Sequence, residues 1–181
     1  MKRIAEWDSI QAVTGGGEQL PAGVYQVGIV SASAGTTQTG KEKLVLALEV
    51  TEGDYQGIFS RKYKAKKQYN EKAQWPCLFH QVTEGDSIGR YKGLIMAIEA
   101  SNPGYHWDFD ETTLKGKSCG CIFREEEFIG QNDGKIHTNT KPYAIIPIDE
   151  IATATVPEKK CIEQPPASGF GRYDDSEAIP F

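Results

Sequence analysis

Apolar and polar residues alternate at every second position along several stretches of this chain, and polar or Gly-containing segments separate these stretches. Alternation of this kind predicts half-buried β-strands, because successive side chains of a strand point to opposite faces. The last two stretches are joined by Asn132-Asp133-Gly134, and an Asp-Gly step is typical of a hairpin turn. The five predicted strands span residues 24–34, 43–51, 58–65, 116–129 and 135–148.

A helical pattern replaces the alternation between the third and fourth predicted strands. Residues 86–100 place apolar side chains on one stripe, with Asp86 or Ser87 as the N-cap and Asn102-Pro103-Gly104 as the stop. Residues 76–82 fit no pattern. Three strands, a helix and two strands are the strand count and helix position of an OB-fold, so the sequence predicts a mainly β, five-stranded OB-fold barrel. The stripe consists of Ile88, Tyr91, Leu94, Ile95 and Ile98.

The predicted barrel leaves a segment at each end. Residues 1–20 form an N-terminal arm of mixed polarity that contains Gly15-Gly16-Gly17, and residues 21–150 form the OB-fold domain. Residues 151–181 are polar, contain several prolines and glycines, and predict a disordered tail. No apolar run is long enough for a membrane span, and the first residues lack the apolar core of a secretion signal. We therefore expect a cytoplasmic protein without a membrane partner.

The formal net charge of −5 at first argues against nucleic acid, but the charge is distributed unevenly. Residues 61–72 contain six basic residues and one acid, a local charge of +5, whereas residues 161–181 carry −3. Such asymmetry indicates a basic surface and an acidic tail on one chain. Lysines at a solvated strand edge, where they discourage edge-to-edge pairing, are the alternative explanation of the basic cluster.

Aromatic side chains interleave with these cations. Single-strand binding without sequence preference needs cations that follow the phosphates and flat rings that stack on bases. The third predicted strand and the connection after it supply both, on the side where an OB-fold binds oligonucleotides. Tyr91, Tyr105, Trp107 and Phe123 are better explained as core residues. The candidate DNA-binding residues are Phe59, Arg61, Lys62, Tyr63, Lys64, Lys66, Lys67, Tyr69, Lys72 and Trp75.

The chain ends with acidic residues followed by a small apolar tip. Such a tip offers a side chain for a pocket and a free carboxylate for an arginine of a partner. In this it resembles bacterial single-stranded DNA-binding proteins (SSB), which end in acids and Ile-Pro-Phe, although Ser176 and Ala178 dilute the acids here. The resemblance implies recruitment of replication, recombination and repair proteins. The residues concerned are Asp174, Asp175, Glu177, Ile179, Pro180 and Phe181.

Two internal segments, LPAGVYQVGIV and EVTEGDYQGIFSRKY, resemble phage-encoded DNA-binding proteins of the SSB type. This resemblance implies a protein that covers single-stranded DNA without making or breaking bonds, needs no cofactor, and forms a homo-oligomer. It would then act in the host bacterial cytoplasm.

Other function classes find less support in the residues. Cys77-x-x-His80 and Cys119-x-Cys121 are spaced for a zinc site only in principle, and the cysteines of a strand are ordinarily buried thiols. No phosphate-binding Gly loop or hydrolase motif occurs, so we expect no enzyme. Two alternatives stay open. One is a structural or protein-interaction β-barrel without DNA binding, and the other is a metal-dependent nuclease using the loop carboxylates Asp108, Asp110 and Glu111.

Overall fold

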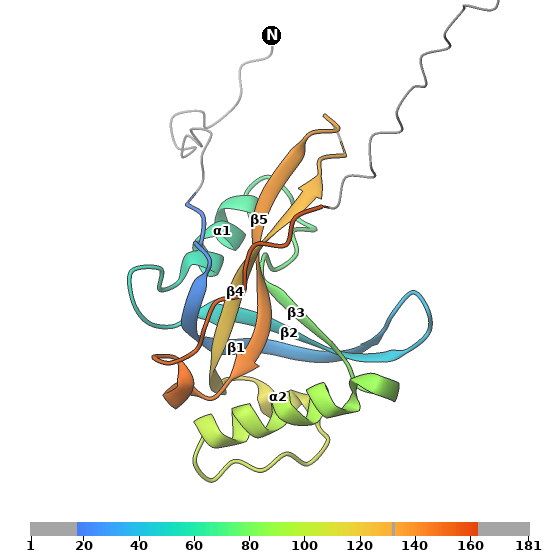
Figure 1. The fold of residues 1–181 in the computed structure, drawn as a ribbon, viewed down its shortest axis with the longest axis vertical. Coiled ribbons are helices and arrows are strands. Elements are labelled where there is room, and N and C mark those ends of the chain that lie inside the picture. Colours follow the sequence, from blue (N-terminus) through green and yellow to red (C-terminus); the bar gives the residue numbers. More distant parts are fainter. Residues whose placement is uncertain (1–17, 132, 163–181) are drawn as a thin grey trace, which may run out of the picture.

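One antiparallel sheet forms the centre of the molecule. The structure is a computed structural model that describes residues 18–131 and 133–162. Its strands hydrogen-bond in the order β3-β2-β1-β4-β5, so β3 and β5 form the two edges (Figure 1). Four of the five predicted strands are confirmed. The strands are β1 (Gly23–Thr36), β2 (Glu42–Val50), β3 (Leu78–Val82), β4 (Ser118–Ile129) and β5 (Ile136–Ile146).

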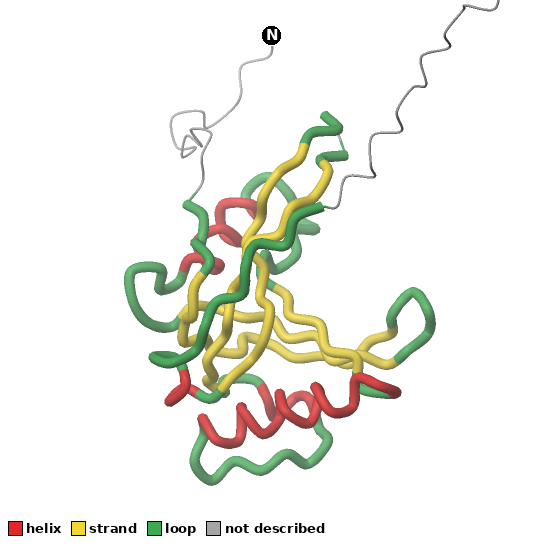
Figure 2. The backbone as a smooth tube through the Cα atoms, viewed as in Figure 1, coloured by secondary structure: helices red, strands yellow, loops and turns green. Residues whose placement is uncertain are grey.

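Two helices accompany the sheet. The predicted helix at residues 86–100 is confirmed as α2 (Ile88–Ser101), which is preceded by a short 3-10 turn and lies across one end of the sheet (Figure 1). The loop after α2 runs along its outer side (Figure 2). Of the predicted stripe, Leu94, Ile95 and Ile98 are buried, whereas Ile88, in the first turn, is exposed. No helix in the described part of the chain is long and apolar enough to cross a membrane.

The third predicted strand is wrong, because residues 58–65 belong to a helix, α1 (Ile58–Lys67). In a strand, where every second side chain shares a face, Phe59 and Tyr63 lie on the same face. Their spacing of four residues also places them on one face of a helix. The neighbouring residues Arg, Lys and Ala are strong helix formers and favour this outcome. The true third strand is β3, in the segment that the sequence pattern leaves unassigned. Five strands with a helix before the fourth thus remain, although one strand comes from a different segment.

The core forms where the apolar face of β2 meets β1, β4 and α2. Leu46, Leu48 and Val50 are fully buried, as are Val27 on β1 and Ile98 on α2. Strand β1 pairs with β4 in its first half and with β2 over most of its length, and the β1–β2 pairing has a register shift between Ile29 and Ser31. The β4–β5 hairpin extends beyond the other strands (Figures 1 and 2).

The expected tail begins later than the sequence indicates. Residues 151–162 return along β4, where the backbone of Lys160 exchanges hydrogen bonds with Glu125 and Glu127 at 2.9 Å. Lys159 Nζ also lies 2.8 Å from the Glu127 carboxylate. This contact is made by backbone groups and one ion pair, so it leaves no hydrophobic period in the sequence. The rest of the predicted tail, residues 163–181, lies outside the described residues.

Candidate nucleic-acid interface

A carboxylate from β2 fixes the start of α1, the helix that carries most of the candidate cations. The helix begins after Gly57, whose φ of 73° is a conformation that favours glycine. No side chain at the N-cap satisfies the first backbone N–H groups. Instead, Glu49 on β2 accepts hydrogen bonds from the N–H groups of Phe59, at 3.0 Å, and Ser60. A negative charge at a helix N-terminus is favourable, so Glu49 ties α1 to the sheet.

We expect Glu49→Ala to lower the free energy of unfolding by about 1–3 kcal/mol, because partly buried helix N–H groups lose a charged acceptor. Urea unfolding followed by circular dichroism measures this loss. Glu52→Ala is the matched control, since Glu52 is exposed and accepts one hydrogen bond, from Gln26. Equal midpoints for the Glu49→Ala and Glu52→Ala variants would show that the carboxylate does not anchor α1.

The cations of α1 point in different directions. Lys64, Lys66 and Lys67 are exposed near the C-terminal end of the helix, and within the described residues none of them forms an ion pair. Arg61 is occupied, because its guanidinium contacts both carboxylate oxygens of Glu18, at 3.1 and 2.9 Å. Lys62 is half-buried and faces inward. The three exposed lysines are therefore the cations best placed to meet phosphates.

The aromatic candidates separate into core and surface. Phe59 is buried, and its ring stacks on Phe123 with the centroids 6.2 Å apart, so it is not available to a base. Tyr63 and Trp75 form a half-buried pair with centroids 5.3 Å apart, and the Trp75 indole donates to the Leu48 carbonyl at 2.8 Å. Tyr69 is 59% exposed. Three of the four candidate rings can thus meet a base at the surface, and Phe59 cannot.

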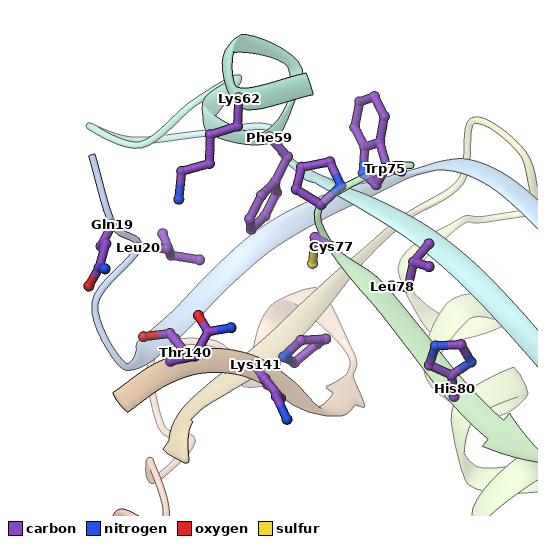
Figure 3. A pocket seen from close by; sticks show the side chains of 13 residues that line it. Gln19, Leu20, Phe59, Lys62, Trp75, Cys77, Leu78, His80, Thr140 and Lys141 are labelled. Carbon is purple, nitrogen blue, oxygen red and sulfur yellow. The ribbon is translucent and has the colours of Figure 1, made fainter. Parts of the chain in front are cut away.

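A pocket of about 390 Å³ lies between α1, β3 and β5 (Figure 3), and Trp75 of the Tyr63–Trp75 pair belongs to its lining. Lys62 reaches toward it from α1, and Lys141 belongs to the facing strand β5. Among the described residues that line it, none is an Asp or a Glu. The lining consists of Gln19, Leu20, Phe59, Lys62, Trp75, Pro76, Cys77, Leu78, His80, Asn139, Thr140, Lys141 and Pro142.

Burial shapes the charge of this pocket. It lowers the pKa of Lys62, an effect that Glu18 partly opposes. Burial, with Lys43 as a further cause, also lowers the pKa of His80, so this imidazole is neutral at pH 7. Burial raises the pKa of Cys77 to about 12, which keeps the thiol protonated. A half-buried ammonium such as that of Lys62 gains from a nearby anion, so the pocket favours a negatively charged ligand.

Comparison with known families adds a result for the first half of the chain. Residues 6–96 match the family described as a protein of unknown function (DUF669), and this stretch is half of the chain. The chain belongs to this family. The DUF669 stretch includes β1, β2, α1, β3 and most of α2, and with them all ten candidate DNA-binding residues. A search of curated proteins finds no match.

Sequence reasoning identified the cations of the DUF669 stretch but missed what surrounds them. Lys141 lies in β5, outside that stretch, and reaches the pocket only because the two sheet edges face each other. It also lies 3.4 Å from the Glu126 carboxylate. Glu49 was missed because capping by a carboxylate from another element leaves no local signal. Neither role has a fixed spacing that a single sequence displays.

The remaining candidates are placed only in part. The six candidate residues of the tip, which fall within residues 174–181, lie outside the described residues. Lys72 is exposed, in the segment between α1 and β3. Cys77, Cys119 and Cys121 are buried thiols, and Cys161 is exposed. Across residues 18–131 and 133–162, no group of three His, Cys, Asp or Glu side chains is arranged to hold a metal.

Proposed function

We propose that this protein binds single-stranded DNA without strong sequence preference. The observation that carries the proposal is the combination at α1. In the described part of the chain, three exposed lysines without ion pairs lie next to the Tyr63–Trp75 pair and a pocket lined by no acidic residue. Cations and flat rings side by side are what binding to unpaired strands requires. Lys67 Nζ lies 5.4 Å from the centre of the Tyr63 ring, so charge and stacking surface are adjacent.

We further propose that the sheet is an OB-type barrel left open between β3 and β5. Strand β1 pairs with both β2 and β4, and the helix α2 sits between β3 and β4 in the chain and packs against β3, β4 and β5. Residues of both edge strands line one pocket, which supports a sheet that curls toward closure. In OB-folds such a surface binds oligonucleotides or oligosaccharides.

The C-terminal tip completes the proposal. Its acidic residues and Ile179-Pro180-Phe181 are assigned to recruiting replication and recombination proteins, on the strength of the SSB resemblance and of the known capture of terminal carboxylates. Several copies of a single small domain are needed to cover a strand, so we propose a homo-oligomer. The mechanism is sequestration, with no cofactor and no catalysed reaction.

Tryptophan fluorescence of the full chain during titration with oligo-dT tests the proposal. We expect quenching that requires Trp75, binding that prefers oligo-dT to duplex DNA, and an affinity that falls with salt by a log–log slope of about −2 to −3 for three to four neutralised phosphates. Trp75→Phe is the diagnostic variant and Trp107→Phe its control. Absence of binding at low salt would favour the structural or protein-interaction β-barrel. Cleavage of the oligonucleotide in Mg²⁺ but not in EDTA would favour a nuclease.

A further inference from the structure

A second pocket, of about 580 Å³, lies at the other end of β2 from α1. Its lining comes from the end of β1, the start of β2, the first part of α2 and the loop that follows α2. Figures 1 and 2 show the course of these segments. Glu42 lines this pocket and Val50 precedes α1, and a strand of that length spans about 26 Å. The pocket is therefore separate from the proposed DNA surface. Its lining consists of Ala34, Gly35, Thr36, Glu42, Lys43, Leu44, Thr83, Tyr91, Trp107, Phe109 and Glu111.

Three aromatic residues line this aromatic–acidic pocket. Trp107 and Tyr91 pack against the hydrophobic core with one side and line the pocket with the other. Phe109 stands next to Trp107, with ring centroids 6.0 Å apart and an angle of 51° between the planes. The Phe109 side chain is 81% exposed, the highest exposure of any large apolar side chain in the described residues. A ring held in water beside another ring offers a face to a ligand.

The backbone at Phe109 is strained. Its φ is 66°, and within the described residues it is the only non-glycine residue with a positive φ. The loop is held by neighbouring carboxylates: Asp108 accepts from the N–H of Asp110 at 3.2 Å, and Asp110 accepts from the N–H of Thr112 at 2.9 Å. Glycine would fit this position without strain. A strained, exposed aromatic residue in place of glycine indicates that the ring has a use.

The charges of the pocket select the class of ligand. Two carboxylates, Glu42 and Glu111, line it, against one ammonium, Lys43, whose stem packs over Gly35. Burial raises the pKa of Tyr91, and the charge of Glu111 raises it further, which places these two groups near each other. Aromatic faces and carboxylates both attract cations, and the carboxylates repel phosphates. A cation is therefore favoured over a nucleotide.

We propose that the aromatic–acidic pocket binds an arginine side chain of a protein partner. A guanidinium is planar, so it can stack on Trp107 or Phe109 while its N–H fork reaches a carboxylate such as Glu111, a combination that an ammonium cannot match. The site would give the protein a contact for basic partners that is separate from both α1 and the C-terminal tip. It does not depend on DNA binding.

Titration of the ¹⁵N-labelled full chain with a short arginine-containing peptide tests this proposal. The indole N–H of Trp107 is the reporter, because it is buried and has no hydrogen-bond partner in the described chain. We expect its resonance to shift with the arginine peptide and not with the same peptide carrying citrulline, the neutral isostere. Equal shifts with both peptides, or none with either, would overturn the proposal. A shift with thymidine monophosphate but not with arginine would overturn it in favour of a base-stacking site.

Two variants separate binding from folding. Glu111→Gln keeps the shape and removes a charge, and we expect about fivefold weaker binding of the arginine peptide. Phe109→Gly removes one ring and relieves the backbone strain, so we expect weaker binding together with an unchanged or raised melting temperature. Phe128→Ala, an exposed aromatic residue of the β4–β5 hairpin, is the control. Wild-type peptide affinity in both pocket variants would contradict the proposal, whereas oligo-dT affinity should be the same in all of them.

Discussion

Replacement of Lys64, Lys66 and Lys67 by glutamate should reduce the affinity for oligo-dT by about 100-fold or more at low salt. Each lysine that meets a phosphate releases a counterion on binding, and a glutamate in its place repels the strand. The three side chains are exposed and make no ion pair in the described part of the chain, so their replacement removes little from the fold beyond the contact of Lys67 with the Tyr63 ring. The melting temperature should stay within a few degrees of the wild type.

Neutral substitutions at the same three positions test the phosphate contacts through the salt dependence of binding. Glutamine at the three positions should make the log–log salt slope less steep by about 2, from a contribution of roughly 0.7 for each phosphate contact on a single strand. Arg90, Lys92 and Lys115, exposed elsewhere on the surface, form the matched control set for charge reversal. If reversal of the control set weakens binding as much as reversal on α1, net charge rather than a defined surface governs the affinity, and the proposed interface fails.

Phe59→Ala should cost about 3–5 kcal/mol of stability, because it removes a buried ring from the core. Phe59 is 7% exposed and stacks on Phe123, which is itself almost fully buried. Chemical unfolding measures the loss. Phe59→Leu keeps most of the volume, so it should fold with a smaller loss and bind oligo-dT as the wild type does.

The surface rings should behave in the opposite way. Tyr69→Ala, at an exposed position, should leave stability nearly unchanged and weaken binding by about 1–3 kcal/mol if the ring stacks on a base. The pair of phenotypes distinguishes a core ring from a stacking ring within one basic segment. A folded Phe59→Leu protein that no longer binds oligo-dT would contradict the assignment of Phe59 to the core alone.

The sequence predicted the parts of the fold that repeat a local pattern. The buried alternation of Leu44, Leu46 and Leu48 and the helical spacing of Leu94, Ile95 and Ile98 correspond to real elements, because one face of each meets the core. Residues 58–65 were misassigned since a few apolar positions fit both periods. Gly57 and the Glu49 carboxylate, nine residues before Ile58, favour the helix at this segment. The pattern of apolar positions within residues 58–65 contains no sign of either.

For the candidate site, too, the sequence predicted the local features and not the long-range ones. Its cations and rings are neighbours in the sequence, so composition alone identified them. Their roles depend on depth: Phe59 is buried, Lys62 faces the pocket, and Arg61 is held by Glu18. Depth follows from the packing of α1 on β2, and the opposite wall of the pocket comes from Lys141, about eighty residues later. Long-range packing of this kind has no signature in a single segment.

The double pairing of β1 also has a consequence for how the chain folds. β1 and β2 are neighbours in sequence, as are β4 and β5, and each pair can form as a local hairpin. The pairing of β1 with β4 instead joins Gly23 to Phe123, one hundred residues apart. Closing so long a loop costs conformational entropy before the contacts between β1 and β4 can form and offset it. The two hairpins should therefore form early, and the docking of β4 on β1 sets the rate at which the native sheet is completed.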